Sequence, residues 1–199
     1  MLKGTWREPL LWWTYSAVVV TCVLGVAYAI VQQDYRTGLD DPQIQMAEDG
    51  ALVLAHGGVP ADVVPHSQPF DAEASLAPWI AVFDQNGMPL ESSASIGAAS
   101  LQLPKGLFDT ATWSKAKMYY QNGMRETRIT WQPNAGTRQA VVLVQTADGR
   151  FVASGRNMRE VEQRIEHEGE IIFAGWLVTL AALLVASLLL KKFFTNLLN

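Results

Sequence analysis

The sequence predicts an α+β fold, in which a five-stranded antiparallel sheet domain with a helix in front of it is flanked by two transmembrane helices. Two apolar stretches predict the membrane part, one from about Leu10 to Val31 and one from Ile171 to Leu190, and the second contains no charged residue. A bilayer core of about 30 Å needs roughly 20 apolar residues in a helix, so each stretch is long enough to span it. Between them, short apolar runs separated by turn residues predict the sheet.

Positive residues next to the two spans predict the orientation of the chain. Lys3 and Arg7 precede the first span, and Lys191 and Lys192 follow the second. Short positive flanks favour the cytoplasm, whereas a long loop is translocated largely regardless of its charge. We therefore expect a multi-pass protein of the cell membrane with a cytoplasmic N-terminus (1–9), transmembrane helix 1 (10–32), an extracytoplasmic domain (33–156), a stalk helix (157–170), transmembrane helix 2 (171–190) and a cytoplasmic C-terminus (191–199).

A cleavable signal peptide is the alternative to an uncleaved first span. Ala27-Tyr28-Ala29 has the form of a signal-peptidase site and follows a basic start and an apolar run. The run is longer than the roughly 7–15 apolar residues of a typical signal peptide. We therefore expect an uncleaved anchor.

The composition between the spans excludes several classes of function. From Asp34 to Gly169 there are 11 Lys and Arg against 17 Asp and Glu, so we expect no nucleic acid partner. The single cysteine, Cys22, lies in the first span, which leaves the domain without disulfides. The three histidines have no metal-ligand spacing, and no G-x-S-x-G motif is present. We expect no metal, no cofactor and no enzymatic activity.

Turn signals set the order of elements within the domain. Asp40-Asp41-Pro42 predicts the start of a helix that Gly57-Gly58 ends. A short helix is predicted around Ala111–Tyr120. The five predicted strands are bounded by turn residues, and they cover Trp79–Asp84, Met88–Ser95, Arg125–Gln132, Gln139–Thr146 and Arg150–Ser154.

The segment after the last strand predicts a helical stalk. Asn157 can cap a helix, with Glu160 three residues later as its reciprocal cap. Met158, Val161 and Ile165 continue at spacings of three and four residues and form a narrow apolar stripe. No proline follows before the second span, so we expect one nearly continuous helix from Asn157 to about Leu190 that could carry a mechanical signal.

Two segments resemble known sensor domains. The run Trp-Ile-Ala-Val-Phe-Asp-Gln-Asn-Gly, from Trp79 to Gly87, resembles the first hairpin of PAS-like and Cache-type extracytoplasmic sensor domains. The run from Asp148 to Glu162 resembles the last strand and exit helix of sensor domains in bacterial membrane histidine kinases. There, a strand ending in Gly-Arg-Ser-Leu-like residues is followed by an Arg-Glu-Val-Glu-like helix that leads into the second span.

The resemblance implies a PAS-like sheet domain with a sensing role, but it does not extend to a kinase. In such kinases, a dimerisation helix with the phosphoacceptor histidine and an ATP-binding domain follow the second span. Here only Lys191–Asn199 follows it. We therefore do not expect kinase activity from this sequence, and we expect another protein to supply the output.

The resemblance also implies a ligand pocket between the sheet and a helical insert. An Arg fork suits carboxylates or phosphates, and an aromatic wall can hold an apolar or cationic group. Candidate residues for a small anionic ligand are Arg125, Arg128, Trp131, Arg138 and Tyr119, with Tyr120 beside it, and Arg128 is the expected anion anchor. The alternative is that Arg125 and Arg128 pair with Glu126, Glu91 or solvent, while Trp131 belongs to the core.

Small residues in the two spans predict helix packing. They recur every four residues, which lets helix backbones approach closely, and they are Ala17, Thr21, Gly25 and Ala29 in the first span and Ala182 and Ala186 in the second. The stripe supports contact between the two spans, with a second copy in a homodimer, or with a membrane protein partner.

Together these patterns predict a membrane-anchored sensory or regulatory subunit. A ligand or a protein contact outside the cell would shift the stalk helix, and a partner in the bilayer would respond. The alternative is a structural accessory subunit of a larger membrane complex, whose domain is a docking surface without a ligand.

Overall fold

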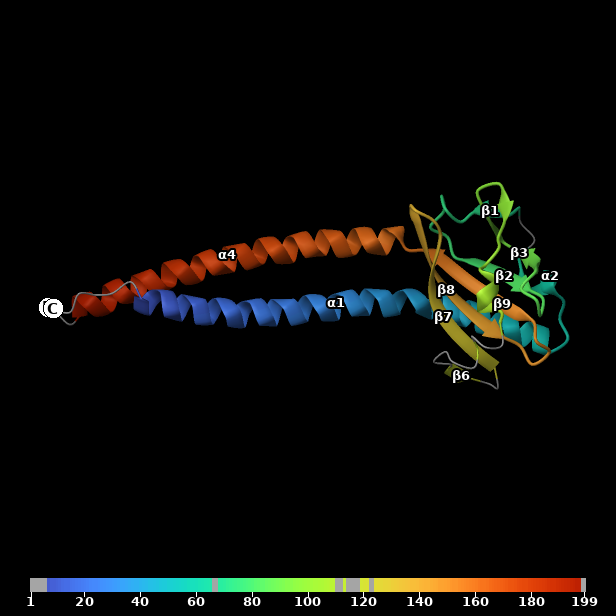
Figure 1. Cartoon of the computed structure of the whole chain (residues 1–199), viewed down its shortest axis with the longest axis horizontal. Helices are drawn as coiled ribbons and strands as arrows, with labels where there is room; N and C mark the ends of the chain where they lie inside the picture. Colours follow the sequence, from blue (N-terminus) through green and yellow to red (C-terminus); the bar gives the residue numbers. More distant parts are fainter. Residues whose placement is uncertain (1–6, 66–67, 110–112, 114–118, 122–123, 198–199) are drawn as a thin grey trace. The chain divides into compact units, whose positions relative to one another are not determined.

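The computed structural model of the chain describes residues 7–65, 68–109, 113, 119–121 and 124–197 (Figure 1). It divides into two compact units. The helical unit contains the described residues up to Tyr35 and those from Gln163 onward. The sheet unit runs from Arg36 to Glu162.

The helical unit is built from parts of two long helices, α1 (Arg7–Ala55) and α4 (Arg159–Leu197), which lie side by side (Figure 1). Side-chain hydrogen bonds join them. Trp13 Nε1 donates to the carbonyl oxygen of Leu180 at 2.9 Å, Trp176 Nε1 donates to Thr21 Oγ1 at 2.9 Å, and the Tyr35 hydroxyl donates to Glu168 Oε1. Both helices are long and apolar enough to cross a membrane. The unit is therefore compatible with a membrane protein.

The helix predicted to start at Asp40-Asp41-Pro42 is not a separate element, which corrects the sequence interpretation. α1 runs without a break through this segment, with Pro42 inside it. Proline removes one backbone hydrogen bond from a helix and disfavours its interior, but no strong stop signal precedes it in the chain. The helix continues as far as Ala55. Two residues later, Gly57 has a φ of 90°, a conformation that commonly ends helices and that glycine adopts readily.

The sheet unit contains an antiparallel sheet with the strand order β3-β2-β9-β8-β7-β6. Its strands are β2 (Trp79–Phe83), β3 (Pro89–Ser92), β6 (Tyr119–Gln121), β7 (Met124–Asn134), β8 (Thr137–Gln145) and β9 (Phe151–Asn157). Five of them confirm the predicted strands. The sixth, β6, corrects the predicted helix at its end, because Tyr119 and Tyr120 pair with β7. Apart from Trp113, the rest of that predicted helix lies outside the described residues.

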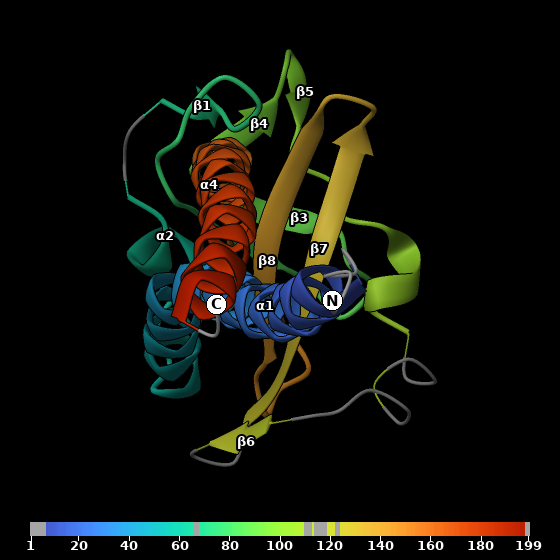
Figure 2. The same cartoon turned by 90° about the vertical axis from the view of Figure 1, so that its left-hand side faces the viewer.

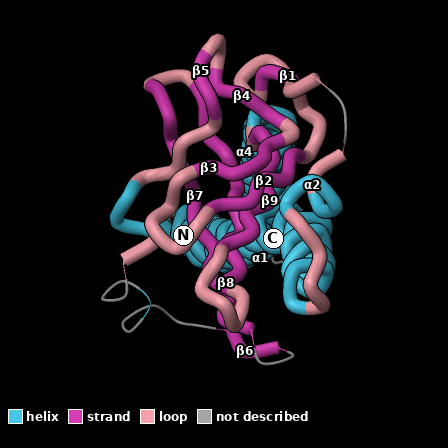
Figure 3. Tube along the Cα trace, turned by 90° about the vertical axis from the view of Figure 1, so that its right-hand side faces the viewer, coloured by secondary structure: helices cyan, strands magenta, loops and turns pink. Residues whose placement is uncertain are grey.

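The predicted strand Met88–Ser95 is divided between two sheets. β3 pairs with β2, but the chain then leaves that sheet, and β4 (Ala94–Ile96) pairs with β1 (Phe70–Asp71) and β5 (Ala99–Ser100). This three-stranded sheet lies at the top of Figures 2 and 3, away from β6. Further short elements within the described residues are the helix α2 (Pro60–Val63) and a 3₁₀ turn at Lys105–Leu107.

Both faces of the six-stranded sheet are covered. On one face, Ala47, Ala51 and Leu54 of α1 pack against β-branched side chains of the central strands. This approach is close, since a Cβ added to Gly50 would lie 3.1 Å from Val152 Cγ1. The opposite face carries a second core that is rich in aromatic residues: Trp79, Phe83, Phe108, Trp113, Trp131 and Phe151.

Candidate functional site

The candidate functional site is the exit junction, residues 156–160, where the sheet passes into α4. β9 ends at Asn157 and α4 begins at Arg159, so a single residue separates strand from helix. Asn157 is only 4% exposed, and its Oδ1 accepts a hydrogen bond from the backbone N–H of Arg159 at 2.9 Å. This bond caps the helix, as the sequence predicts. The strand therefore leads into the helix without an intervening loop.

The same asparagine binds a loop that is remote in sequence. Its Nδ2 donates to the backbone oxygen of Glu73 at 2.9 Å and to that of Ala72 at 3.3 Å. Gln139 Nε2, from the neighbouring strand, also donates to the Ala72 oxygen, at 2.8 Å, while its Oε1 accepts from Trp79 Nε1. One buried amide cluster thus holds the loop against β8 and β9.

Two arginines extend this attachment along the loop. Arg156 Nε donates to the backbone oxygen of Leu76 at 3.0 Å, and Arg159 donates to that of Ala74 at 3.2 Å. The carbonyl groups of residues 72, 73, 74 and 76 therefore all accept hydrogen bonds from side chains of the sheet or the exit junction. We call residues 72–76 the clamped loop. Hydrogen bonds from charged donors contribute about 1.5–3 kcal/mol when they are shielded from water and less when they are exposed.

Ion pairs and apolar contacts fix the first turn of α4 to the sheet as well. Arg156 pairs with Glu160 at 2.8 Å, and Arg138 of β8 pairs with Glu162 at 2.9 Å. Met158 is buried against Ala140, and its backbone N–H donates to the Arg138 oxygen. These exposed ion pairs contribute about 0–1 kcal/mol each, so the buried amides and Met158 dominate the attachment.

This arrangement can convert a change in the sheet or the clamped loop into a movement of a helix. A loop displacement would pull on Asn157 and on both arginines, which lie within three residues of the helix start. Met158 alone separates β9 from α4, so these hydrogen bonds link the clamped loop and the sheet to the first turn of the helix.

The structure places four of the predicted stalk residues in the sheet unit and one in the helical unit. Asn157 and Met158 are buried, Glu160 and Val161 are half-buried at the start of α4, and Ile165 is half-buried further along the helix. Val161 packs against Met158 and Ala140. The apolar stripe therefore begins as part of the domain.

The structure does not bring the predicted ligand-binding residues together. Trp131 is buried in the aromatic core, whereas Arg128, three positions earlier on β7, lies on the other face of the sheet and binds Glu126 Oε1 at 2.6 Å. Arg138 pairs with α4, Arg125 is exposed, and Tyr119 belongs to the edge strand β6. The pairing of Arg128 and the burial of Trp131 agree with the alternative reading, and a binding role for these residues stays a prediction.

Carboxylates of α1 and β7 influence one another on the face of the sheet that α1 covers. Glu126 is only 4% exposed and is neutralised by Arg128. Burial, followed by the negative charges of Glu126 and Asp49, raises the pKa of Glu48, while Arg128 opposes that rise. Glu48, Glu126 and Arg128 thus form a charged cluster on the face of the sheet that α1 covers. Across the described ranges, no three His, Cys, Asp or Glu side chains are placed to hold a metal ion.

Most residues of the small-residue stripe are exposed in the helical unit. Ala17 is half-buried, whereas Thr21, Gly25, Ala29, Ala182 and Ala186 are exposed. Thr21 still contacts α4 through Trp176. The half-buried residues of α1 in this unit are mostly larger and include Trp13, Val20, Leu24 and Tyr28. A role of the stripe in contacts with another protein stays a prediction.

Sequence reasoning missed the clamped loop and its partners Arg156, Arg159 and Gln139. Residues 72–75 are small or polar, which is typical of a surface connection, and no local pattern indicates that the carbonyl groups of the clamped loop are bound. Gln139 begins a strongly apolar predicted strand. A single amide at that position was the one signal in the sequence for a buried hydrogen bond. No family model, curated protein or solved structure matches this chain.

Proposed function

We propose that this protein is a two-pass membrane protein whose extracytoplasmic PAS/Cache-like domain acts as a sensory or regulatory subunit. Ligand binding or contact with another protein changes the sheet unit, and α4 passes that change to a partner in the membrane. The exit junction carries this proposal, because one residue joins β9 to a helix of 39 residues that continues into the helical unit.

The membrane placement rests on sequence and helix length. α1 and α4 each contain an apolar segment long enough to span, and positive residues flank the ends remote from the sheet unit. This charge distribution supports cytoplasmic termini and an extracytoplasmic sheet unit.

The strand arrangement supports a PAS-like domain. The first hairpin, β2 and β3, lies beside the last strand, β9, so that the five principal strands have the order β3-β2-β9-β8-β7. This sheet agrees with the five-stranded antiparallel sheet that the resemblance implies, and the two sequence segments that carry the resemblance fall on β2 with its turn and on the passage from β9 into α4. Fold likeness alone does not assign a function, so the coupling at the exit junction remains the main support.

A crosslinking experiment in the native membrane tests the sensory role. A photo-reactive amino acid at Leu189, an exposed position of α4 within the predicted span, would capture the partner in the bilayer. We expect a histidine kinase, a chemoreceptor or a cyclase. Capture of a transporter, a translocon or an energy-converting complex would contradict the sensory role.

A variant of the exit junction separates signalling from assembly. Asn157→Ala removes the helix cap and both bonds to the clamped loop, and it should change the activity of the captured partner severalfold without changing the crosslinking yield. Loss of a cap costs about 0.5–2 kcal/mol, so thermal unfolding must confirm that the variant is folded. Asn86→Ala makes the same truncation at an exposed turn and should leave the partner's activity unchanged.

One observation favours a second candidate, an accessory subunit whose domain docks without a ligand. The face of the sheet opposite α1 is occupied by aromatic side chains, with Phe108 packed between Phe83 and Phe151 at ring centroid distances of 5.2 and 5.1 Å. In that case Asn157→Ala should lower the amount of assembled complex and leave the activity of each assembled complex unchanged.

A further inference from the structure

A groove of about 700 Å³ lies between α1 and α4 within the helical unit. Gly25 of α1 and Gly169 of α4 lie on its walls, and their lack of side chains leaves the space between the helices open. The Tyr28 side chain crosses this space, because a Cβ added to Gly169 would lie 3.2 Å from the tyrosine hydroxyl. Trp176 forms another wall and is fixed by its bond to Thr21.

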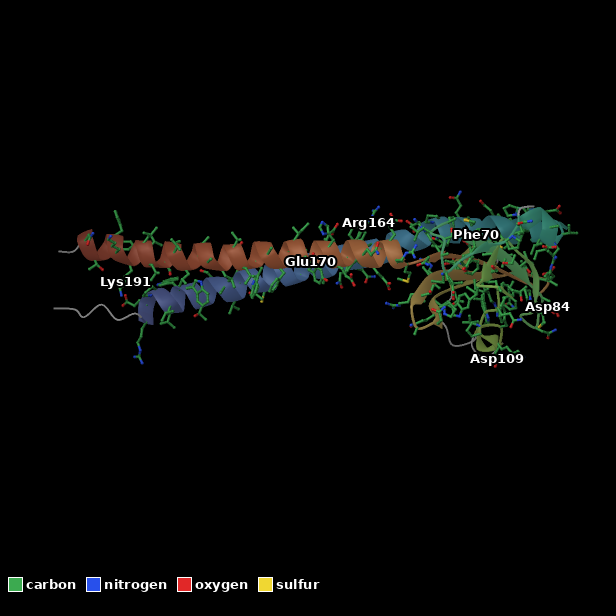
Figure 4. All side chains as sticks on the ribbon, turned by 90° about the horizontal axis from the view of Figure 1, so that it is seen from above. Phe70, Asp84, Asp109, Arg164, Glu170 and Lys191 are labelled. Carbon is green, nitrogen blue, oxygen red and sulfur yellow. The ribbon has the colours of Figure 1, made fainter. Side chains whose placement is uncertain are left out.

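The groove changes from polar to apolar along its length. Glu166 and Glu170 line one end, one helical turn apart on α4, immediately before the apolar span that begins at Ile171. Figure 4 labels Glu170 on the part of α4 that runs beside α1. Phe173 and Trp176 follow inside the span and form the apolar end of the groove, which Leu24 of α1 also lines. In a bilayer, the carboxylates would lie at the headgroup level and the apolar end would face the acyl chains.

The residues at the polar end select for positive charge. Two carboxylates attract a cation and repel an anionic headgroup. The neighbouring Tyr28 and Trp176 rings can add a cation–π attraction. A primary ammonium group carries three hydrogen-bond donors, which carboxylate oxygens accept well. We propose that this groove binds a phospholipid with a primary ammonium headgroup, with the ammonium group beside Glu166 and Glu170 and the upper acyl chain between Leu24 and Phe173.

Size and charge favour a lipid over a second copy of the chain. A volume of about 700 Å³ lies in the range of small-molecule sites, about 300–1,000 Å³. A symmetric dimer through this groove would bring Glu166 and Glu170 of the two copies together, and like charges close to each other repel. A lipid with an ammonium group balances both carboxylates instead.

Lipid retention by the full chain tests the proposal. The protein is reconstituted in vesicles of phosphatidylethanolamine, phosphatidylcholine and phosphatidylglycerol in equal amounts, extracted in mild detergent, and analysed by native mass spectrometry. We expect phosphatidylethanolamine to be enriched over phosphatidylglycerol by between about twofold and thirtyfold, since each interfacial charge pair contributes about 0.2–1 kcal/mol. Equal retention of the three lipids, or enrichment of phosphatidylcholine over phosphatidylethanolamine, would overturn the assignment.

Two pairs of variants locate the bound lipid. Glu166→Gln with Glu170→Gln should abolish the enrichment. Glu168→Gln removes a single carboxylate of the same segment, from a residue that binds Tyr35, and should retain the enrichment. Gly25→Leu should expel the lipid by filling the groove. Gly175→Leu is its control, because a Cβ at either glycine meets no atom within 4 Å and Gly175 does not line the groove. Enrichment that survives Gly25→Leu would place the lipid elsewhere.

The proposal rests on the membrane placement above and not on the sensory role. Labelling of Asn86→Cys in a Cys22→Ser background, from outside intact cells, reports whether the domain is translocated. Failure of that labelling overturns both proposals, whereas normal labelling without lipid enrichment overturns the groove assignment alone. A disulfide-linked dimer through Gly25→Cys would assign the groove to a second copy and also overturn it.

Discussion

Replacing Gln43 by methionine is expected to stabilise the protein, although the substitution removes a polar group. Gln43 is fully buried, and neither its Nε2 nor its Oε1 has a hydrogen-bond partner among the described residues. It lies on α1 one turn before Ala47 and two turns before Ala51, both of which pack in the core between α1 and the sheet. A buried amide without a partner costs about 1–3 kcal/mol.

Methionine removes that cost without opening a cavity. It is close to glutamine in length and in helix propensity, and its flexible side chain adapts to an existing space. We therefore expect Gln43→Met to raise the free energy of unfolding by about 1–3 kcal/mol. For a domain of about 130 residues, this corresponds to a rise in Tm of roughly 3–5 °C per kcal/mol.

Thermal unfolding of the full chain in lipid nanodiscs, followed by near-ultraviolet circular dichroism of the buried tryptophans, measures this effect. Gln45→Met is the matched control, since Gln45 is exposed on the same helix and should change stability by less than about 0.5 kcal/mol. A loss of about 1 kcal/mol or more in Gln43→Met alone would show that the amide is hydrogen-bonded in the folded protein. That result would refute the reasoning.

Three further substitutions have directions that follow from the structure. Gly155→Ala should lower stability by about 1–3 kcal/mol, because the new Cβ would lie 2.2 Å from Cζ2 of the buried Trp79. A hydrogen bond from Arg150 lowers the pKa of Asp148 from 3.8 to about 2. Its carboxylate therefore stabilises the fold above pH 4, and this contribution is lost as the pH falls through about 2. Because the Asp148 side chain is 48% exposed, Asp148→Asn should cost only about 0.5–1 kcal/mol at pH 7. The raised pKa of Glu48 has the opposite effect on stability, because the folded state binds its proton more tightly than the unfolded state. The charged form of Glu48 therefore destabilises the fold at neutral pH. Glu48→Gln should therefore raise the Tm at pH 7, and the gain should disappear as the pH falls below about 4.

Matched variants make these three measurements decisive. Gly136→Ala adds the same methyl group where the nearest heavy atom is 4.0 Å away, and its Tm should be unchanged. Glu91→Gln removes a carboxylate from an exposed position of β3, and its Tm should follow the wild-type pH profile. A difference between Glu48→Gln and wild type that is equal at pH 4 and pH 7 would contradict the electrostatic explanation, and so would equal stability of Asp148→Asn and wild type at pH 7.

Periodicity and turn chemistry predicted the main elements of the fold. The strands that became β2, β7, β8 and β9 carry alternating or apolar runs between glycine-containing turns, and these signals are local. α4 was predicted as one helix because no proline interrupts it after Asn157. Local signals also predicted a helix start at Pro42, but the helix already formed by the preceding residues continues through the proline.

Features that depend on remote partners could not be predicted. In the sequence, β3 and β4 follow each other without a turn signal and therefore look like one strand. They are separate strands only because β4 pairs with β1 and β5 in another sheet. At the exit junction, the sequence predicted the cap made by Asn157. Its bonds to Ala72 and Glu73 join residues more than 80 positions apart, and a single sequence contains no local signal for such contacts.

The two unbroken helices also set a rule for changes in chain length. Each residue inserted into an α-helix turns the residues beyond it by about 100° and moves them by about 1.5 Å. α1 and α4 both pass from one unit into the other without a loop. One residue added to α4 after Gln163 would therefore turn Phe173 and Trp176 to a different side of the helix. Seven added residues would restore their angular phase to within about 20°, so insertions of this length best preserve the side of α4 on which these residues lie relative to the start of the helix.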